Sequence, residues 1–177
     1  MLCISERKRQ PSRSSRSKRW GPSRQETRRR VPQAGPIADP VVPKKTAVGA
    51  LVLVVEDFDD AREILTSLLQ FYGFRVVEAV KGNEAVEKAM HLLPDIVLMD
   101  LALPGMDGWQ ATRELKAHPR TRKIPVIAVT AHALPEDERK ALDAGCDSFL
   151  TKPVHPTELL GEMRRLLERI GPKRPGA

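Results

Sequence analysis

The sequence predicts an α/β domain in which five parallel strands form one doubly wound sheet covered by helices on both faces. From Leu51 onward, apolar runs of strand length alternate with helical segments of roughly ten to fifteen residues. The apolar runs are continuous, which is typical of parallel strands buried on both faces. Together, the regular alternation and the continuous apolar runs predict a (βα)5 architecture.

The five predicted strands are the short apolar runs of this pattern. The third run is aliphatic from Ile96 to Met99 and then reaches an acid, Asp100, where a buried strand would carry a negative charge. The predicted strands cover Leu51–Val55, Arg75–Ala79, 96–100, Val126–Thr130, and 149–150 with its flanks.

Helical periodicity separates these strands. In the first predicted helix, apolar residues recur at helical spacing up to Tyr72, and Gly73 is placed to end it. Gly145 is placed to end the fourth helix, and Pro156 is suited to the first turn of the last one. The remaining predicted helices cover 83–92, 109–117, 136–144 and Pro156–Ile170.

Charge divides the chain into two parts. Residues 1–46 hold 13 Lys/Arg and 3 Asp/Glu, a net charge of +10, whereas residues 47–177 hold 17 and 20, a net charge of −3. The first segment is rich in Arg, Ser and Pro and lacks apolar periodicity, so we predict a disordered tail at 1–46. We place the folded domain at 47–172 and a short tail at 173–177.

The basic tail admits several interpretations. It could contact nucleic acid or an anionic membrane, or serve as an organellar transit peptide. The sequence favours a solvated extension or a start codon set too far upstream, because no stacking aromatic accompanies the charges apart from Trp20.

Cysteine usage and hydropathy indicate a compartment. Cys3 and Cys146 are far apart and do not suggest a disulfide framework or a zinc site. No apolar run approaches the roughly 20 residues that a membrane helix needs. The sequence therefore predicts a soluble, cytoplasmic protein.

Polar residues follow the predicted strands at the edge where ligands gather in open parallel sheets. Glu56 and Asp57 follow the first strand, Asp100 ends the third, Thr130 ends the fourth and Lys152 follows the fifth. Three adjacent carboxylates repel, and Mg²⁺ with a lysine relieves that repulsion. A central aspartate can then act as a nucleophile that forms an acyl phosphate, with the threonine hydroxyl binding an anion.

Each residue also has an ordinary structural explanation. Glu56 and Asp57 could serve only to favour a helix N-terminus, and Asp100 could cap a turn. Lys152 could be a surface lysine, and Thr130 could be a plain strand residue. The functional interpretation depends on the four strand ends carrying these residue types together and in order.

This constellation resembles the receiver domain of bacterial two-component response regulators, over roughly residues 51–170. The motifs are "VVED", "DIVLMDLALPGMDG", "VIAVTA" and "FLTKPV". The resemblance implies a flavodoxin-like fold and a stand-alone, chemotaxis-regulator-like switch. It also implies Mg²⁺ as cofactor and phosphoryl transfer to Asp100 from a sensor histidine kinase or phosphotransfer protein. Only autophosphorylation from phosphodonors and slow autodephosphorylation are then expected, with no other enzyme activity.

The same matching implies a metal site. Asp57 and Asp100 would be direct metal ligands, and Glu56 would act largely through a metal-bound water. The backbone carbonyl of Ala102 would complete the protein ligands. Glu56 replaces the aspartate that is commoner in the family.

The resemblance also implies a switch. Thr130 and Lys152 would bind the phosphoryl group, and Phe149, in place of the frequent tyrosine, would occupy the aromatic switch position. The face made by the fourth helix, fifth strand and fifth helix would then change its affinity for a downstream protein, with homodimerisation as one outcome. Ala102 and His132 occupy positions that tune hydrolysis, and because alanine offers no hydrogen bond we expect an acyl-phosphate lifetime of minutes or longer.

Four local features are expected as well. The Lys152–Pro153 bond matches a cis peptide of the family, and Gly105 and Gly108 are expected to need positive φ in the turn after Asp100. Cys146 is expected to pack as a small apolar residue.

The same residues bear on several alternative functions. A nucleic-acid-binding regulator would use the basic tail, and a degenerate receiver would serve as a protein-interaction scaffold. A phosphohydrolase with an aspartate nucleophile would carry Asp-x-Asp on its first strand, where this chain has adjacent Glu56 and Asp57. A flavin-binding relative would need a glycine- and hydroxyl-rich loop, where this chain has the acidic "EDFDDARE".

Overall fold

The computed structural model describes residues 49–131 and 134–170. The predicted tails at 1–46 and 173–177, and His132, lie outside this part. Its ten elements are β1 Leu51–Val55, α1 Asp59–Phe71, β2 Arg75–Ala79, α2 Gly82–Leu92, β3 Ile96–Met99, α3 Gly108–Ala117, β4 Val126–Thr130, α4 Pro135–Asp143, β5 Ser148–Thr151 and α5 Pro156–Ile170.

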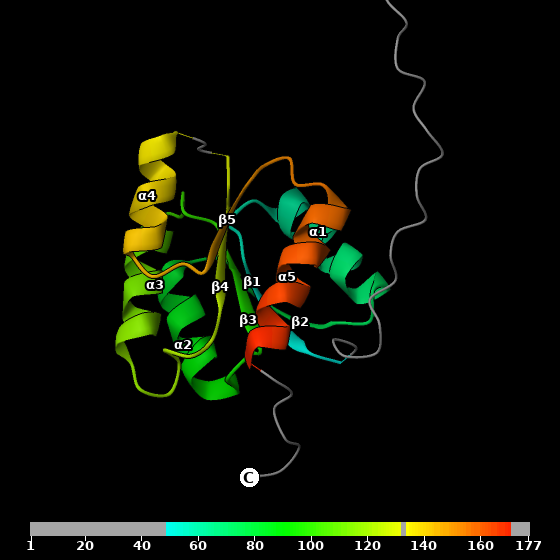
Figure 1. Cartoon of the computed structure of the whole chain (residues 1–177), viewed down its shortest axis with the longest axis horizontal. Helices are drawn as coiled ribbons and strands as arrows, with labels where there is room; N and C mark the ends of the chain where they lie inside the picture. The colour runs from blue at the N-terminus through cyan, green and yellow to red at the C-terminus, as the bar shows by residue number, and fades with distance from the viewer. Residues whose placement is uncertain (1–48, 132–133, 171–177) are drawn as a thin grey trace, which may run out of the picture. The chain divides into compact units, whose positions relative to one another are not determined.

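The five strands form one parallel sheet with the order β2-β1-β3-β4-β5 (Figure 1). The chain moves from β1 outward to β2 and then returns to β3 on the other side of β1. The strand order therefore reverses between β1 and β3, which is where open α/β sheets place their ligand sites. The predicted flavodoxin-like, doubly wound fold is confirmed.

Helices cover both faces of the sheet. Figure 1 shows α1 and α5 on one side and α2, α3 and α4 on the other. Alternate residues of β1 and β3 enter two apolar clusters: Leu53 and Val97 pack with α2, α3 and α4, whereas Val52 and Ile96 pack with α1 and α5. Every residue of β3 is buried, as its continuous apolar run predicts.

The predicted elements form with small shifts at their ends. The third strand stops at Met99, one residue before the predicted end, and α2 begins at Gly82 instead of residue 83. Gly73 and Gly145 have φ of +84° and +100° just after α1 and α4, so both helices end at the predicted glycines.

The local predictions have a mixed outcome. Lys152–Pro153 is cis, Gly105 has φ of +79°, and Cys146 is buried in the apolar cluster beside α3. The prediction for Gly108 is wrong, because this residue starts α3 without positive φ. A Cβ there would lie 2.1 Å from the carbonyl oxygen of Asp100, so the chain needs a glycine for its small size.

No helix within the described ranges is long and apolar enough to span a membrane.

Candidate functional site

Three carboxylates meet where β1 and β3 end. Glu56 and Asp57 follow β1, and Asp100 follows β3 directly. Glu56 is 4% exposed and Asp100 is 6% exposed, whereas Asp57 is open to solvent. One carboxylate oxygen from each residue lies within 4.8 Å of the others. The structure therefore brings the predicted acids together, two in the protein interior and one at its surface.

Backbone hydrogen bonds of the sheet fix the two buried acids. The N–H of Glu56 donates to the carbonyl of Ala79 on β2 at 3.0 Å, and the N–H of Asp100 donates to the carbonyl of Val55 at 2.9 Å. These bonds continue the parallel ladders one residue past each strand. The backbone positions of both acids thus follow from the strand register.

Lys152 binds both buried acids. Its Nζ donates to Asp100 Oδ2 at 2.6 Å and to Glu56 Oε2, and its backbone N–H donates to the carbonyl of Thr130 at 2.9 Å. The other oxygen of Asp100, Oδ1, accepts from the N–H of Ala102 at 3.0 Å. Both oxygens of Asp100 are therefore held in place by donors.

Burial and hydrogen bonding shift the pKa values of Glu56 and Lys152. Burial raises the pKa of Glu56, and the hydrogen bond from Lys152 offsets this only in part. Burial alone would lower the pKa of Lys152, but hydrogen bonds to Asp100 and Glu56 outweigh it and the pKa of Lys152 is raised. The lysine therefore stays charged beside the two buried acids.

The remaining predicted residues lie around this cluster. Thr130 ends β4 and is fully buried, Ala102 is exposed in the loop after Asp100, and Phe149 on β5 packs partly buried against the cluster beside α2, α3 and α4. His132 lies outside the described residues.

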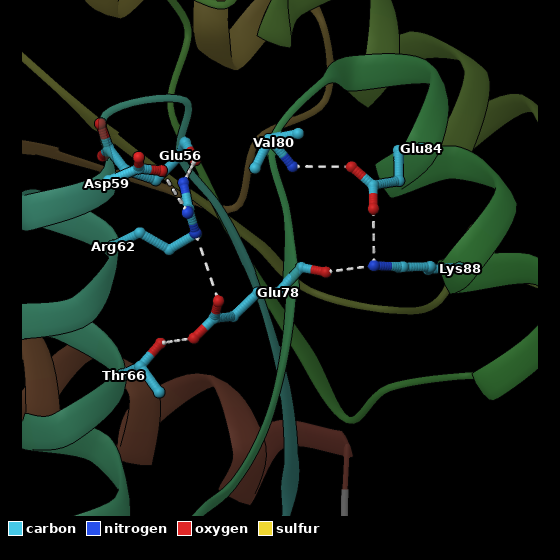
Figure 2. Close-up of polar contacts among 8 residues, drawn as sticks. All are labelled: Glu56, Asp59, Arg62, Thr66, Glu78, Val80, Glu84 and Lys88. Atoms are coloured by element: carbon cyan, nitrogen blue, oxygen red, sulfur yellow. Dashed lines mark hydrogen bonds and ion pairs between the residues drawn. The ribbon is translucent and has the colours of Figure 1, made fainter.

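The predicted set omits Arg62 of α1. Its Nη1 donates to the backbone carbonyl of Glu56 at 3.0 Å (Figure 2). The sequence contains a signal for it: Arg62 follows Asp59 by three residues, a spacing that allows an ion pair on a helix.

Comparison with known proteins gives the family. A model of the response regulator receiver domain matches residues 52–164. The chain is 39% identical over 121 residues to the phosphate regulon transcriptional regulatory protein PhoB of Escherichia coli, covering 68% of this chain and 53% of PhoB. It is 38% identical over 119 residues to the response regulator PleD of Caulobacter vibrioides, covering 67% of this chain and 26% of PleD. The chain thus spans about half of the length of PhoB and about a quarter of the length of PleD.

Solved structures of receiver domains superpose on this chain. The receiver domain of a sensor histidine kinase from Pseudomonas aeruginosa, which has a magnesium ion coordinated in its active-site cleft, superposes with a TM-score of 0.65 at 36% identity, covering 68% of this chain and 99% of that domain. A signal receiver domain of a histidine kinase from Syntrophus aciditrophicus gives a TM-score of 0.67 at 32% identity, covering 73% and 98%. This chain belongs to the receiver-domain family of two-component response regulators.

Proposed function

We propose that this chain is a phosphoacceptor switch in which Asp100 receives a phosphoryl group from a sensor histidine kinase or phosphotransfer protein. The observation that carries the proposal is the buried Asp100 carboxylate, held by Lys152 beside two further carboxylates at the carboxyl edge of the sheet. The chain would act as a signalling switch, with autophosphorylation and slow autodephosphorylation as its only reactions.

The donor set fits Mg²⁺. Three carboxylates contribute oxygens within 4.8 Å of one another, and Mg²⁺ prefers oxygen ligands. Lys152 supplies one positive charge against three acids, so an excess of negative charge remains. Asp57 and Asp100 would hold the ion, with the backbone carbonyl of Ala102 and, through water, Glu56. Bound Mg²⁺ would offset the charge of the phosphoryl oxygens.

The transfer itself is a displacement at phosphorus. An oxygen of Asp100 attacks, a P–O bond forms, and the P–N bond to the donor imidazole breaks, with the electron pair of that bond going to the nitrogen. Lys152 already contacts Asp100 Oδ2, so its ammonium would meet the oxygens of the transferred phosphoryl group. The Thr130 hydroxyl at the end of β4 would bind a second oxygen.

The consequence of transfer would be a population shift. Because phosphorylation replaces the Asp100 carboxylate with an acyl phosphate, it would add about one negative charge in a site where charge is already unbalanced. Movement of Thr130 and Phe149 would bias two arrangements of the α4–β5–α5 face that differ by a few kcal/mol. That face would bind a downstream protein or a second copy of the chain. Ala102 offers the acyl phosphate no side-chain hydrogen bond, which supports slow hydrolysis.

Phosphorylation by acetyl phosphate tests the proposal. We expect the purified protein to gain the mass of one phosphoryl group only with Mg²⁺, as measured by intact mass spectrometry, and Asp100→Ala to gain none. Asp107→Ala is the matched control: Asp107 is in the same loop but caps α3 by accepting from the N–H of Gln110 at 2.7 Å, so this variant should still be phosphorylated.

Two outcomes would contradict the proposal. One is an equal mass gain in Asp100→Ala. The other is no gain in wild-type protein whose circular dichroism shows an intact fold, which would favour a degenerate receiver that serves as a scaffold.

A further inference from the structure

A chain of polar contacts links α1, β2 and α2 to the backbone of Glu56 (Figure 2). Arg62 is at its centre and uses all three guanidinium nitrogens. Nε donates to Glu78 Oε2 at 3.2 Å, Nη2 to Asp59 Oδ1 at 2.5 Å, and Nη1 to the backbone carbonyl of Glu56 at 3.0 Å. The guanidinium therefore joins a strand, a helix and the backbone of the site.

Glu78 is itself held on both sides (Figure 2). Its Oε1 accepts from the hydroxyl of Thr66 at 2.8 Å, and its backbone carbonyl accepts from Lys88 Nζ at 2.6 Å. Lys88 pairs with Glu84 at 2.6 Å, and Glu84 accepts from the N–H of Val80 at 2.8 Å. The anchor that Arg62 uses on β2 is thus fixed by α1 and α2 together.

The contact with the Glu56 carbonyl matters because of peptide geometry. That carbonyl and the N–H of Asp57 belong to one planar peptide unit, so holding the oxygen fixes the plane that leads to the Asp57 Cα. Glu56 has a second restraint in Lys152, whereas the Asp57 side chain is exposed and has no hydrogen-bond or ion-pair partner within the described residues. Arg62 therefore restrains the peptide that leads to Asp57, and the direction in which Asp57 points depends on that peptide.

We propose that Arg62 is a positioning residue for the acid pair, which orients Asp57 toward the cluster by holding the Glu56–Asp57 peptide. This inference rests on the proposed Mg²⁺ site. The Arg62 side chain is 14% exposed, so its fork is largely fixed by packing and its three acceptors. Lysine has the same charge but one nitrogen, and it cannot bind a carbonyl and two carboxylates in this planar arrangement.

The test is Mg²⁺ affinity, measured by isothermal titration calorimetry on the whole chain. We expect Arg62→Lys to weaken Mg²⁺ binding roughly tenfold, as is typical when the support of a metal ligand is lost. At saturating Mg²⁺, its phosphorylation rate with acetyl phosphate should return close to that of wild type. Arg165→Lys is the control, because Arg165 pairs with Glu162 on α5 through two nitrogens at 3.0 and 2.7 Å, away from the site.

Arg62→Met separates positioning from charge. Removing a cation near three carboxylates should by electrostatics alone tighten Mg²⁺ binding, whereas loss of positioning should weaken it. Urea unfolding in EDTA gives each variant's metal-free stability, so a weakened affinity in a stably folded variant supports the inference.

The outcomes are distinguishable. Tighter binding in Arg62→Met, or wild-type affinity in Arg62→Lys, would overturn the inference and leave the proposed function standing. Failure of the wild-type protein to bind Mg²⁺ would overturn both.

Discussion

At the scale of single residues, the ammonium of Lys152 contacts two of the three carboxylates and leaves the third to solvent. Burial raises the pKa of Glu56 even with the lysine beside it, so the pairing does not fully offset desolvation. Apolar side chains of similar volume at these positions would often give an equally or more stable fold. The excess of negative charge at this site agrees with the Mg²⁺ site proposed above.

The thiol of Cys146 provides a prediction at the same scale. Burial raises the pKa of Cys146 from 9.0 to about 11, and its Sγ lies 3.8 Å from the hydroxyl of Thr112. We therefore expect Cys146 not to react with a thiol reagent at pH 8 in the folded protein, and to react once urea unfolds it. A Cys3→Ser variant isolates this thiol, since the chain has two cysteines.

The same shift predicts a pH dependence of stability. The unfolded thiol loses its proton near pH 9 and the folded one near pH 11. The free energy of unfolding should therefore decrease as the pH rises from 9 to 11, and this group should contribute on the order of 1 kcal/mol per pH unit. A Cys146→Ala variant should lack this decrease in the free energy of unfolding. Fast labelling of Cys146 in the folded protein at pH 8 would contradict the raised pKa of its thiol.

At the scale of elements, two helical glycines have opposite requirements. A Cβ on Gly108, at the start of α3, would lie 2.1 Å from the carbonyl oxygen of Asp100 and 2.7 Å from the Cα of Leu101, both backbone atoms. A Cβ on Gly161, within α5, would meet nothing within 4 Å. The first glycine lets a helix approach the site, and the second serves no packing purpose.

Alanine at each position tests this difference by urea unfolding. We expect Gly108→Ala to lower the free energy of unfolding by about 1–3 kcal/mol, because the backbone after Asp100 must move. Gly161→Ala should raise it by about 0.5–1 kcal/mol, through helix propensity. Equal effects of the two substitutions would show that the approach of α3 to Asp100 tolerates a methyl group.

The sequence could predict elements better than contacts between them. Continuous apolar runs and helical periodicity locate all ten elements, because burial imposes those patterns locally. The prediction of positive φ at Gly108 is wrong, because the close approach of α3 to Asp100 depends on tertiary packing that no local pattern records. Arg62 was missed for the same reason: its contacts with Glu78 and the Glu56 carbonyl join segments that only the folded sheet brings together.

At the scale of the whole molecule, the site depends on the sheet topology. Glu56 and Asp100 are 44 residues apart in the chain, yet they become neighbours because β1 pairs with β3 in parallel. The motif-bearing strand ends could be predicted to converge, because parallel strands end at the same edge. Which acid is buried and which is exposed could not be predicted, because it depends on how the loop after β1 leaves the sheet.

Mg²⁺ should therefore stabilise the whole fold, because only the folded chain assembles the three acids. A ligand that binds the native state alone raises the free energy of unfolding by about 2.7 kcal/mol at a hundred times its dissociation constant. We expect this gain in urea unfolding of wild-type protein followed by circular dichroism.

Asp57→Asn should lose most of the stabilisation by Mg²⁺. Its free energy of unfolding in EDTA should be unchanged or higher, because Asp57 is exposed and its charge repels two buried acids. Potassium chloride at matched ionic strength controls for screening, and an equal gain with potassium would show that the cluster is relieved by salt alone and needs no bound ion.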